Sequence, residues 1–148
     1  MAISKIKHGE WVVVCDGRKA LILENMGDAK FPNLRLRETH EQSDSPTHLQ
    51  GTDNPGRVHA SVGKSRSSVE QTDWHDLAER AFLRDLAARL DAAIVAKQTK
   101  HLFVVAPPRA LGMLREAYTP QVRKALQGEI DKDLIGIPIH EIEKRLFA

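Results

Sequence analysis

The chain has almost nothing that would place it outside the cell or in a membrane. It contains one cysteine, Cys15, in 148 residues, so no disulfide can form within it. Its apolar runs are a few residues long, whereas a membrane-spanning helix needs about 20 residues. The N-terminal residues include lysines but neither an apolar stretch nor a small-residue cleavage site, so they do not resemble a secretory signal. These absences predict a soluble, cytoplasmic protein with no membrane contact.

Aromatic residues and excess charge are also scarce. Aromatics make up 5% of the residues, and 22 basic side chains against 20 acidic ones leave a net charge of +2. Bulk charge therefore does not indicate nucleic-acid binding, which would need a local basic patch. The few large aromatics, among them Trp11, Trp74 and Phe82, are predicted to pack in the core between strand and helix.

What remains is the composition of one globular domain, with 41% hydrophobic and 28% charged residues. We predict a single domain over residues 1–148. It opens with apolar, β-rich runs at 11–15 and 19–23, joined by Asp16-Gly17, a pair typical of a hairpin in which the glycine supplies a positive φ. Residues 34–39 alternate apolar and polar, which completes a predicted antiparallel meander.

A long helix is predicted over about residues 74–97, with Asp73 as its N-cap. Its apolar residues recur at steps of four: Trp74, Ala78, Phe82, Leu86, Leu90 and Ile94, with Leu77, Ala81 and Ala93 widening the stripe. Asp76–Arg80 and Asp85–Arg89 have the i,i+4 spacing of ion pairs.

The rest of the chain predicts two strands and three further helices. A buried strand at 101–106 is followed by helices that open at Pro108 and Pro120, the second closed by Gly128. An exposed edge strand at 129–134 and a short last helix containing Ile139, Ile142 and Leu146 complete the order. A right-handed crossover that returns the fourth strand beside the first gives an α/β fold: a mixed five-stranded sheet of order 3-2-1-4-5, the ribonuclease H-like arrangement.

Residues 42–72 are polar and aperiodic, and they predict a long flexible loop of the kind that often carries function. The stretch 56–66 has no acidic residue and contains the candidate phosphate-binding side chains Arg57, His59, Lys64, Ser65 and Arg66. The alternative is a solvated loop whose charges have no role. A nucleotide-hydrolase phosphate loop is excluded, because Val58 stands where that motif needs a glycine.

No complete catalytic or metal site is evident, and no cofactor is predicted. Asp16 is a weak candidate for the first metal ligand of a ribonuclease H-type nuclease, but it is equally explained as a turn residue. The second ligand would fall at residues 106–107, which are Ala-Pro. The seven histidines lack metal-ligand spacing, and Cys15 has no evident base.

Several segments together resemble a known bacterial family. They are Trp11-Val-Val-Val-Cys-Asp-Gly-Arg18, Pro55-Gly-Arg57, Phe103-Val-Val-Ala-Pro-Pro108, Leu111-Gly-Met-Leu-Arg115 and Glu129-Ile-Asp-Lys-Asp-Leu134. The series resembles the family named "protein required for attachment to host cells", which is similar to the middle domain of eukaryotic and archaeal peptide release factors.

That resemblance implies a function for the 42–72 loop. In release factors, the loop between the third strand and the long helix carries a Gly-Gly-Gln motif that promotes peptidyl-tRNA hydrolysis. Here no Gly-Gly-Gln is present: the closest approach is Gly63-Lys64-Ser65, and Gln71 has no glycines before it. The resemblance therefore implies contact with RNA, tRNA or the ribosome without that catalysis.

Three hypotheses follow. The first is a non-enzymatic release-factor-like domain that binds RNA, tRNA or the ribosome through residues 42–72. The second is a protein-interaction or regulatory module that affects attachment to host cells indirectly. The third is a hydrolase acting on peptidyl-tRNA or nucleic acid. The sequence leaves the oligomeric state open.

Overall fold

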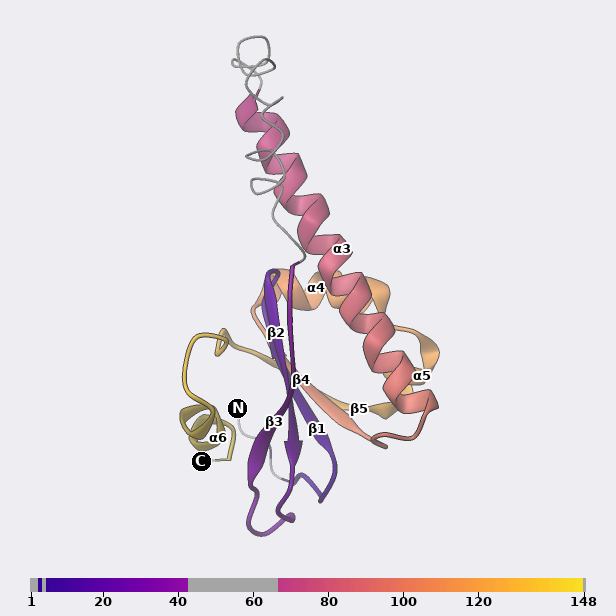
Figure 1. The fold of residues 1–148 in the computed structure, drawn as a ribbon, viewed down its shortest axis with the longest axis vertical. Coiled ribbons are helices and arrows are strands. Elements are labelled where there is room, and N and C mark those ends of the chain that lie inside the picture. The colour runs from indigo at the N-terminus through magenta and orange to yellow at the C-terminus, as the bar shows by residue number, and fades with distance from the viewer. Residues whose placement is uncertain (1–2, 4, 43–66, 148) are drawn as a thin grey trace.

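The protein is built around one mixed sheet of five strands, shown in Figure 1. The computed structural model describes residues 3, 5–42 and 67–147. The strands are β1 (Trp11–Cys15), β2 (Lys19–Asn25), β3 (Leu34–Glu41), β4 (Leu102–Ala106) and β5 (Leu126–Asp131). The helices are α3 (Ser67–Val95), α4 (Pro108–Ala117), α5 (Pro120–Ala125) and α6 (Ile139–Phe147). The strand order β3-β2-β1-β4-β5 confirms the predicted fold.

The two central strands, β1 and β4, are buried along their whole length. They pair in parallel, with Val13 opposite Val104, while β2 lies antiparallel on the other side of β1. A strand covered on both faces needs no polar face, which is why both sequences are continuous apolar runs. Because β1 and β4 run in the same direction, the turn after Cys15 and the proline after Ala106 meet at one edge of the sheet.

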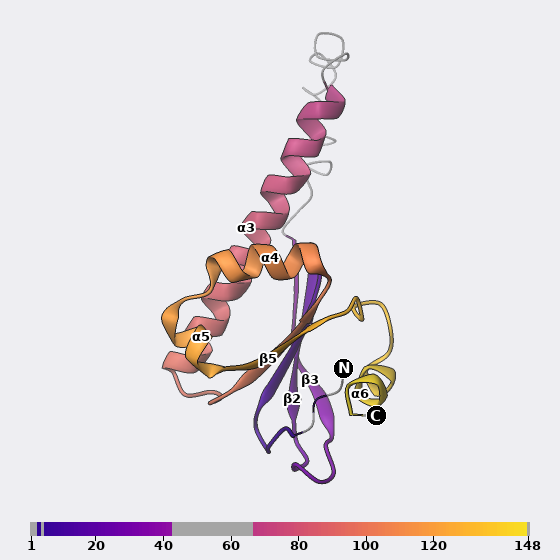
Figure 2. The ribbon, with the colours of Figure 1, turned by 180° about the vertical axis from the view of Figure 1, so that it is seen from behind.

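Each face of the sheet has its own hydrophobic core. Trp11, Val13 and Cys15 face α3, α4 and α5, whereas Val12 and Val14 face α6 and the N-terminal residues. Figure 2 shows α6 lying apart from the other helices, beside the two chain ends. The backbone N–H of Ile3 donates to the carbonyl of Leu146, 2.6 Å away, so the N-terminal segment and α6 close this face together.

Helix α3 begins at Ser67, so the prediction of a helix over 74–97 with Asp73 as N-cap was wrong at its start. Asp73 lies inside the helix, and the predicted loop 42–72 is helical from residue 67 onward. Figures 1 and 2 show the first turns of α3 extending beyond the end of the sheet. A helix that projects into solvent needs no apolar stripe, so hydrophobic periodicity could not reveal this part.

The same projection explains a second error. Trp74 was predicted to lie in the core, but its side chain is 50% exposed, and Leu77 is 63% exposed. Trp11 and Phe82 are buried as predicted. Only the part of α3 that lies over the sheet buries its stripe, since Phe82, Leu86 and Leu90 belong to the core.

Two further details differ from the sequence predictions. Helix α5 ends at Ala125 and β5 starts at Leu126, so Gly128 pairs with Phe103 inside the edge strand and does not end a helix. Arg89 was predicted to pair with Asp85, but its guanidinium binds Glu38 on β3 and Gln98. Asp76 and Arg80 do form the predicted ion pair, at 3.1 Å. No helix of the described residues is long and apolar enough to cross a membrane.

Candidate functional site at the base of the 42–72 segment

The sequence placed its phosphate-binding candidates in the stretch 56–66. Arg57, His59, Lys64, Ser65 and Arg66 lie outside the described residues. What the structure describes is the base of the segment that holds them. That base lies where β3 ends, beside the turn between β1 and β2.

Gln42, the residue after β3, forms two hydrogen bonds to that turn. Its backbone N–H donates to the carbonyl of Arg18 at 2.9 Å, and its side-chain amide donates to the carbonyl of Gly17 at 2.9 Å. A hollow of about 270 Å³ lies here, lined by Arg18, Lys19, Glu41 and Gln42. Lys19 and Glu41 approach within 3.9 Å across it. The segment therefore leaves the sheet from a fixed point beside two basic side chains.

Asp16 organises the turn itself. Its Oδ1 accepts hydrogen bonds from the backbone N–H groups of Arg18 at 2.8 Å and Lys19 at 2.9 Å. This is an Asx-type turn, in which a short carboxylate takes the place of a backbone acceptor. Among the residues that the structure describes, no three His, Cys, Asp or Glu side chains are grouped to hold a metal ion. Asp16 acts here as a turn residue, and the geometry of the described residues gives it no partners for a metal site.

The sequence predicted a positive φ for Gly17, and this prediction was wrong. Among the described glycines, only Gly9 has a positive φ. The small size of Gly17 has another reason. A Cβ at Gly17 would lie 2.8 Å from Cγ and Cδ of Glu79 on α3. The glycine thus leaves room for the Glu79 side chain beside the hairpin turn.

Glu79 begins a chain of ion pairs that joins α3 to α4. It accepts from Nε of Arg109 at 2.9 Å, and Arg109 also binds Asp76 at 2.5 Å. Asp76 in turn holds Arg80, which reaches Glu116 at 2.9 Å. Hydrogen bonding from Arg80, aided by the charge of Arg109, holds the pKa of Asp76 below its usual range.

This network was not predicted, apart from the pair Asp76–Arg80. Arg109 and Glu79 are 30 residues apart in sequence and meet only because α4 crosses α3 at the sheet edge. Their charges are matched by each other, so the network positions α3 and offers no free group for catalysis. It links α3 to α4 near the point where α3 leaves the sheet.

The nuclease hypothesis can be judged at the same edge. Pro107 stands beside Asp16, where a ribonuclease H-type enzyme would need its second carboxylate. Burial, with a smaller contribution from Asp16, raises the pKa of the Cys15 thiol to about 12. The thiol is therefore protonated at neutral pH and is a poor nucleophile.

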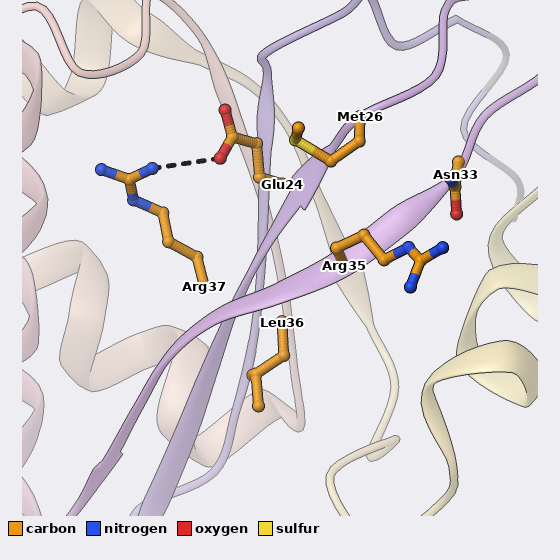
Figure 3. A pocket seen from close by; sticks show the side chains of 6 residues that line it. All are labelled: Glu24, Met26, Asn33, Arg35, Leu36 and Arg37. Atoms are coloured by element: carbon orange, nitrogen blue, oxygen red, sulfur yellow. Dashed lines mark hydrogen bonds and ion pairs between the residues drawn. The ribbon is translucent and has the colours of Figure 1, made fainter.

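A second hollow, of about 460 Å³, lies against β2 and β3 and is shown in Figure 3. It is lined by Glu24, Met26, Asn33, Arg35, Leu36 and Arg37. Arg37 is held by Glu24 at 3.0 Å, and Arg35 points away from that pair. The charged side chains of this hollow therefore do not all point to one place.

Comparison with known proteins agrees with the release-factor resemblance. The family model of bacterial archaeo-eukaryotic release factor family 12 matches residues 10–146. A protein of Rickettsia prowazekii (strain Madrid E), named Uncharacterized protein RP470, is 24% identical over 140 residues, which cover 93% of this chain and 91% of the relative.

Among solved structures, the chain is similar to ethanolamine utilization protein EutJ from Carboxydothermus hydrogenoformans. The sequence identity is 19% and the TM-score 0.41, with 90% of this chain and 46% of that one covered. The chain thus spans a little under half the length of that protein, and a likeness this distant carries no argument about function. The family match, by contrast, spans nearly the whole chain. The protein therefore belongs to bacterial archaeo-eukaryotic release factor family 12.

Proposed function

We propose that the protein is a non-catalytic, release-factor-like domain that contacts RNA, as tRNA or within the ribosome, through residues 42–72. The observation that carries the proposal is the family match over residues 10–146. In the release factors that this family resembles, the corresponding segment between the third strand and the long helix is the functional one.

The described ends of the segment support this role. One end is fixed at the sheet edge by Gln42. The other end, residues 67–72, forms the start of α3, a 29-residue helix that is about 43 Å long and extends past the sheet. The segment therefore joins the body of the domain to the tip of a projecting helix. A ligand could reach that tip without contacting the rest of the domain.

The chemistry of the segment favours a phosphate-bearing partner. Arg57, Lys64 and Arg66 supply three positive charges in a stretch without acidic residues, and His59 and Ser65 can add hydrogen bonds. Glu70 and Asp73, by contrast, place acidic residues near the start of α3 in the sequence. We therefore assign the phosphate contacts to the stretch 56–66 and not to the helix.

The proposal leaves out hydrolysis for a chemical reason. The sequence has no Gly-Gly-Gln, and Gln71 is preceded by Glu70. Without the two glycines, the backbone freedom that this motif provides next to its glutamine is missing. Binding is thus supported, whereas peptidyl-tRNA hydrolysis has no identified group to perform it.

Co-sedimentation with ribosomes tests the proposal. The full-length protein is incubated with purified ribosomes over a range of salt concentrations, beside the triple variant Arg57→Ala/Lys64→Ala/Arg66→Ala. We expect binding that falls with salt. In a plot of log K against log salt concentration, the slope should be smaller by about 2 for the variant, since each lost contact with single-stranded RNA removes about 0.7. The melting temperature should be unchanged.

The matched control is Lys5→Ala/Lys100→Ala/Lys124→Ala, which removes three exposed cations from other parts of the surface. It should bind as the unchanged protein does. Equal losses in both variants would show that bulk charge, and not the segment, governs binding. Absence of the protein from the pellet at every salt concentration would contradict the proposal.

The second candidate is a protein-interaction or regulatory module that affects attachment to host cells indirectly. The observation that favours it is the near-neutral net charge of +2. Capture of one defined protein that survives nuclease treatment, together with no ribosome binding, would favour this candidate over the first.

A further inference from the structure

The outer face of α3 carries an apolar stripe that nothing in the described structure covers. Three large side chains on it are exposed: Trp74 by 50%, Leu77 by 63% and Val95 by 64%. They are half of the exposed large hydrophobic side chains found among the described residues. Three exposed alanines lie between them, and we call the whole set the outer stripe: Trp74, Leu77, Ala81, Ala88, Ala92 and Val95.

The outer stripe is distinct from the face that packs on the sheet. Phe82, Leu86 and Leu90 are buried against the sheet. At about 100° per residue, the centre of the outer stripe lies on the opposite side of the helix. A helix with apolar residues on opposite sides is normally buried on both. The outer stripe therefore has the character of an interface.

Charged residues in the middle of the outer stripe indicate what covers it. Arg84 and Asp85 are both exposed, and neither forms an ion pair with another residue in the part of the chain that the structure describes. Counting about 100° per residue, Arg84 lies about 50° to one side of the centre of the outer stripe and Asp85 about 50° to the other. The outer stripe is thus flanked by a positive side chain, Arg84, on one side and a negative one, Asp85, on the other, at nearly the same position along the helix axis.

We propose that a second copy of this chain packs its α3 against the outer stripe, parallel and in register, about a two-fold axis that runs along the helices. In this arrangement each flank meets the opposite flank of the other copy, so Arg84 of each copy lies beside Asp85 of the other. An antiparallel pair centred on these residues would instead place arginine beside arginine and aspartate beside aspartate. Unlike charges favour the parallel pair.

The shape of the face fits a second helix. Ala81, Ala88 and Ala92 leave room for close approach in the middle, while Trp74 with Leu77 at one end and Val95 at the other supply apolar area. The sheet and the other helices lie on the inner side of α3, so the two bodies would point away from each other (Figures 1 and 2). Six apolar residues per copy are fewer than the roughly 20 residues a side of a stable interface. The dimer is accordingly weak and depends on concentration.

Sedimentation velocity of the full-length protein over a wide concentration range tests the association. We expect a monomer–dimer equilibrium whose dissociation constant rises at least about tenfold in Leu77→Glu. The control is Phe31→Glu, which changes a side chain that is 71% exposed at the β2–β3 connection and should leave the equilibrium unchanged. A protein that stays monomeric at all concentrations, or a dimer insensitive to Leu77→Glu, overturns the proposal.

Charge exchange tests the orientation. Arg84→Asp should weaken the dimer about tenfold, because it places carboxylates together on both flanks. The double variant Arg84→Asp/Asp85→Arg should restore the original dissociation constant, since it re-forms both unlike pairs in the opposite sense. Failure of the double variant to restore association contradicts the parallel arrangement.

A cysteine cross-link provides an independent readout. Under mild oxidation Ala88→Cys should form a disulfide-linked dimer, because position 88 of each copy faces its counterpart. Gln121→Cys, on the exposed surface of α5, should not. The native Cys15 is buried and does not interfere. A link that forms only when Ala81→Cys and Ala88→Cys chains are mixed would indicate the antiparallel pair and overturn the proposal.

Discussion

At the scale of single residues, burial decides what Cys15 can do. Its side chain is fully buried at the end of β1, and removal from water disfavours the thiolate. Its pKa is thereby raised to about 12, with Asp16 adding a smaller effect of the same sign. The thiol of Cys15 is therefore both buried in the core and protonated at neutral pH.

We expect native protein at pH 8 to react with a thiol reagent far more slowly than protein unfolded in guanidinium chloride, since both thiolate formation and access require unfolding. Absorbance after addition of a chromogenic disulfide reagent measures both rates. The unfolded sample is the control for reagent activity. Comparable rates in the two samples would show that Cys15 is accessible.

Glu38 is the residue with the clearest link between charge and stability. Its carboxylate accepts from Arg89 on α3, with Nε at 2.9 Å, and contacts His40 at 2.9 Å. Hydrogen bonding from Arg89 is the main reason that the pKa of Glu38 is lowered from its usual value of 4.5. The same guanidinium lies over the Trp11 ring, 5.7 Å from its centroid, so the pair also covers the core.

Glu38→Gln should lower the free energy of unfolding at pH 7 by about 1.5–3 kcal/mol, the usual range for a lost hydrogen bond to a charged group. A lowered folded-state pKa means that the stabilising effect is complete above pH 4.5 and is lost as the pH falls through the folded-state pKa. Urea denaturation from pH 7 to pH 3 should therefore show the difference between the two proteins shrinking at the acidic end. A constant difference would assign the effect to packing.

At the scale of secondary-structure elements, the contact between the β1–β2 turn and α3 depends on Gly17. A methyl group there would displace Glu79 from its place beside Arg109. The φ of Gly17 is not positive, so alanine is compatible with its backbone. The three atoms nearest to that methyl group all belong to the side chain of Glu79.

A double-mutant cycle separates these effects. Gly17→Ala alone should destabilise the protein, whereas in the Glu79→Ala background the same change should be neutral or stabilising by about 0.4–1 kcal/mol, because alanine restricts the unfolded chain. Chemical denaturation of the four proteins gives the coupling. Additive effects would mean that Gly17 is needed for a different reason.

At the scale of the whole molecule, one sheet serves two cores. Leu86 of α3 lies in one core and Leu146 of α6 in the other, and both are almost fully buried. The strand β1 contributes alternate residues to each, so neither core can persist without the central strands. We infer that the domain unfolds as one unit.

Leu86→Ala and Leu146→Ala should each cost about 2–5 kcal/mol, and the double variant should show nearly the sum because the sites lie on opposite faces of the sheet. Calorimetry should give a single transition in all three. Leu36→Ala, at a side chain that is 49% exposed, should change stability by about 0.5 kcal/mol or less. Two separate transitions would contradict the shared-sheet interpretation.

The fold was largely predictable because its signals are local. Continuous apolar runs specify β1 and β4, and prolines at the first helical position specify α4 and α5. The strand order followed from these elements and the handedness of crossovers. The start of α3 was missed because a helix that projects into solvent needs no apolar period. The boundary between α5 and β5 was missed because the strand follows the helix with no loop residue between them.

The candidate site divides in the same way. The sequence by itself determined the sheet, the basic stretch at residues 56–66 and the missing Gly-Gly-Gln, since each depends on residue type and order along the chain. The fastening of Gln42 to Gly17, the ion pairs of Arg109 and the exposure of Trp74 were decided by tertiary structure. These join or separate residues far apart in sequence: the pairing of β2 with β3 brings Gln42 to Gly17, and the packing of α3 decides the partners of Arg109 and the exposure of Trp74.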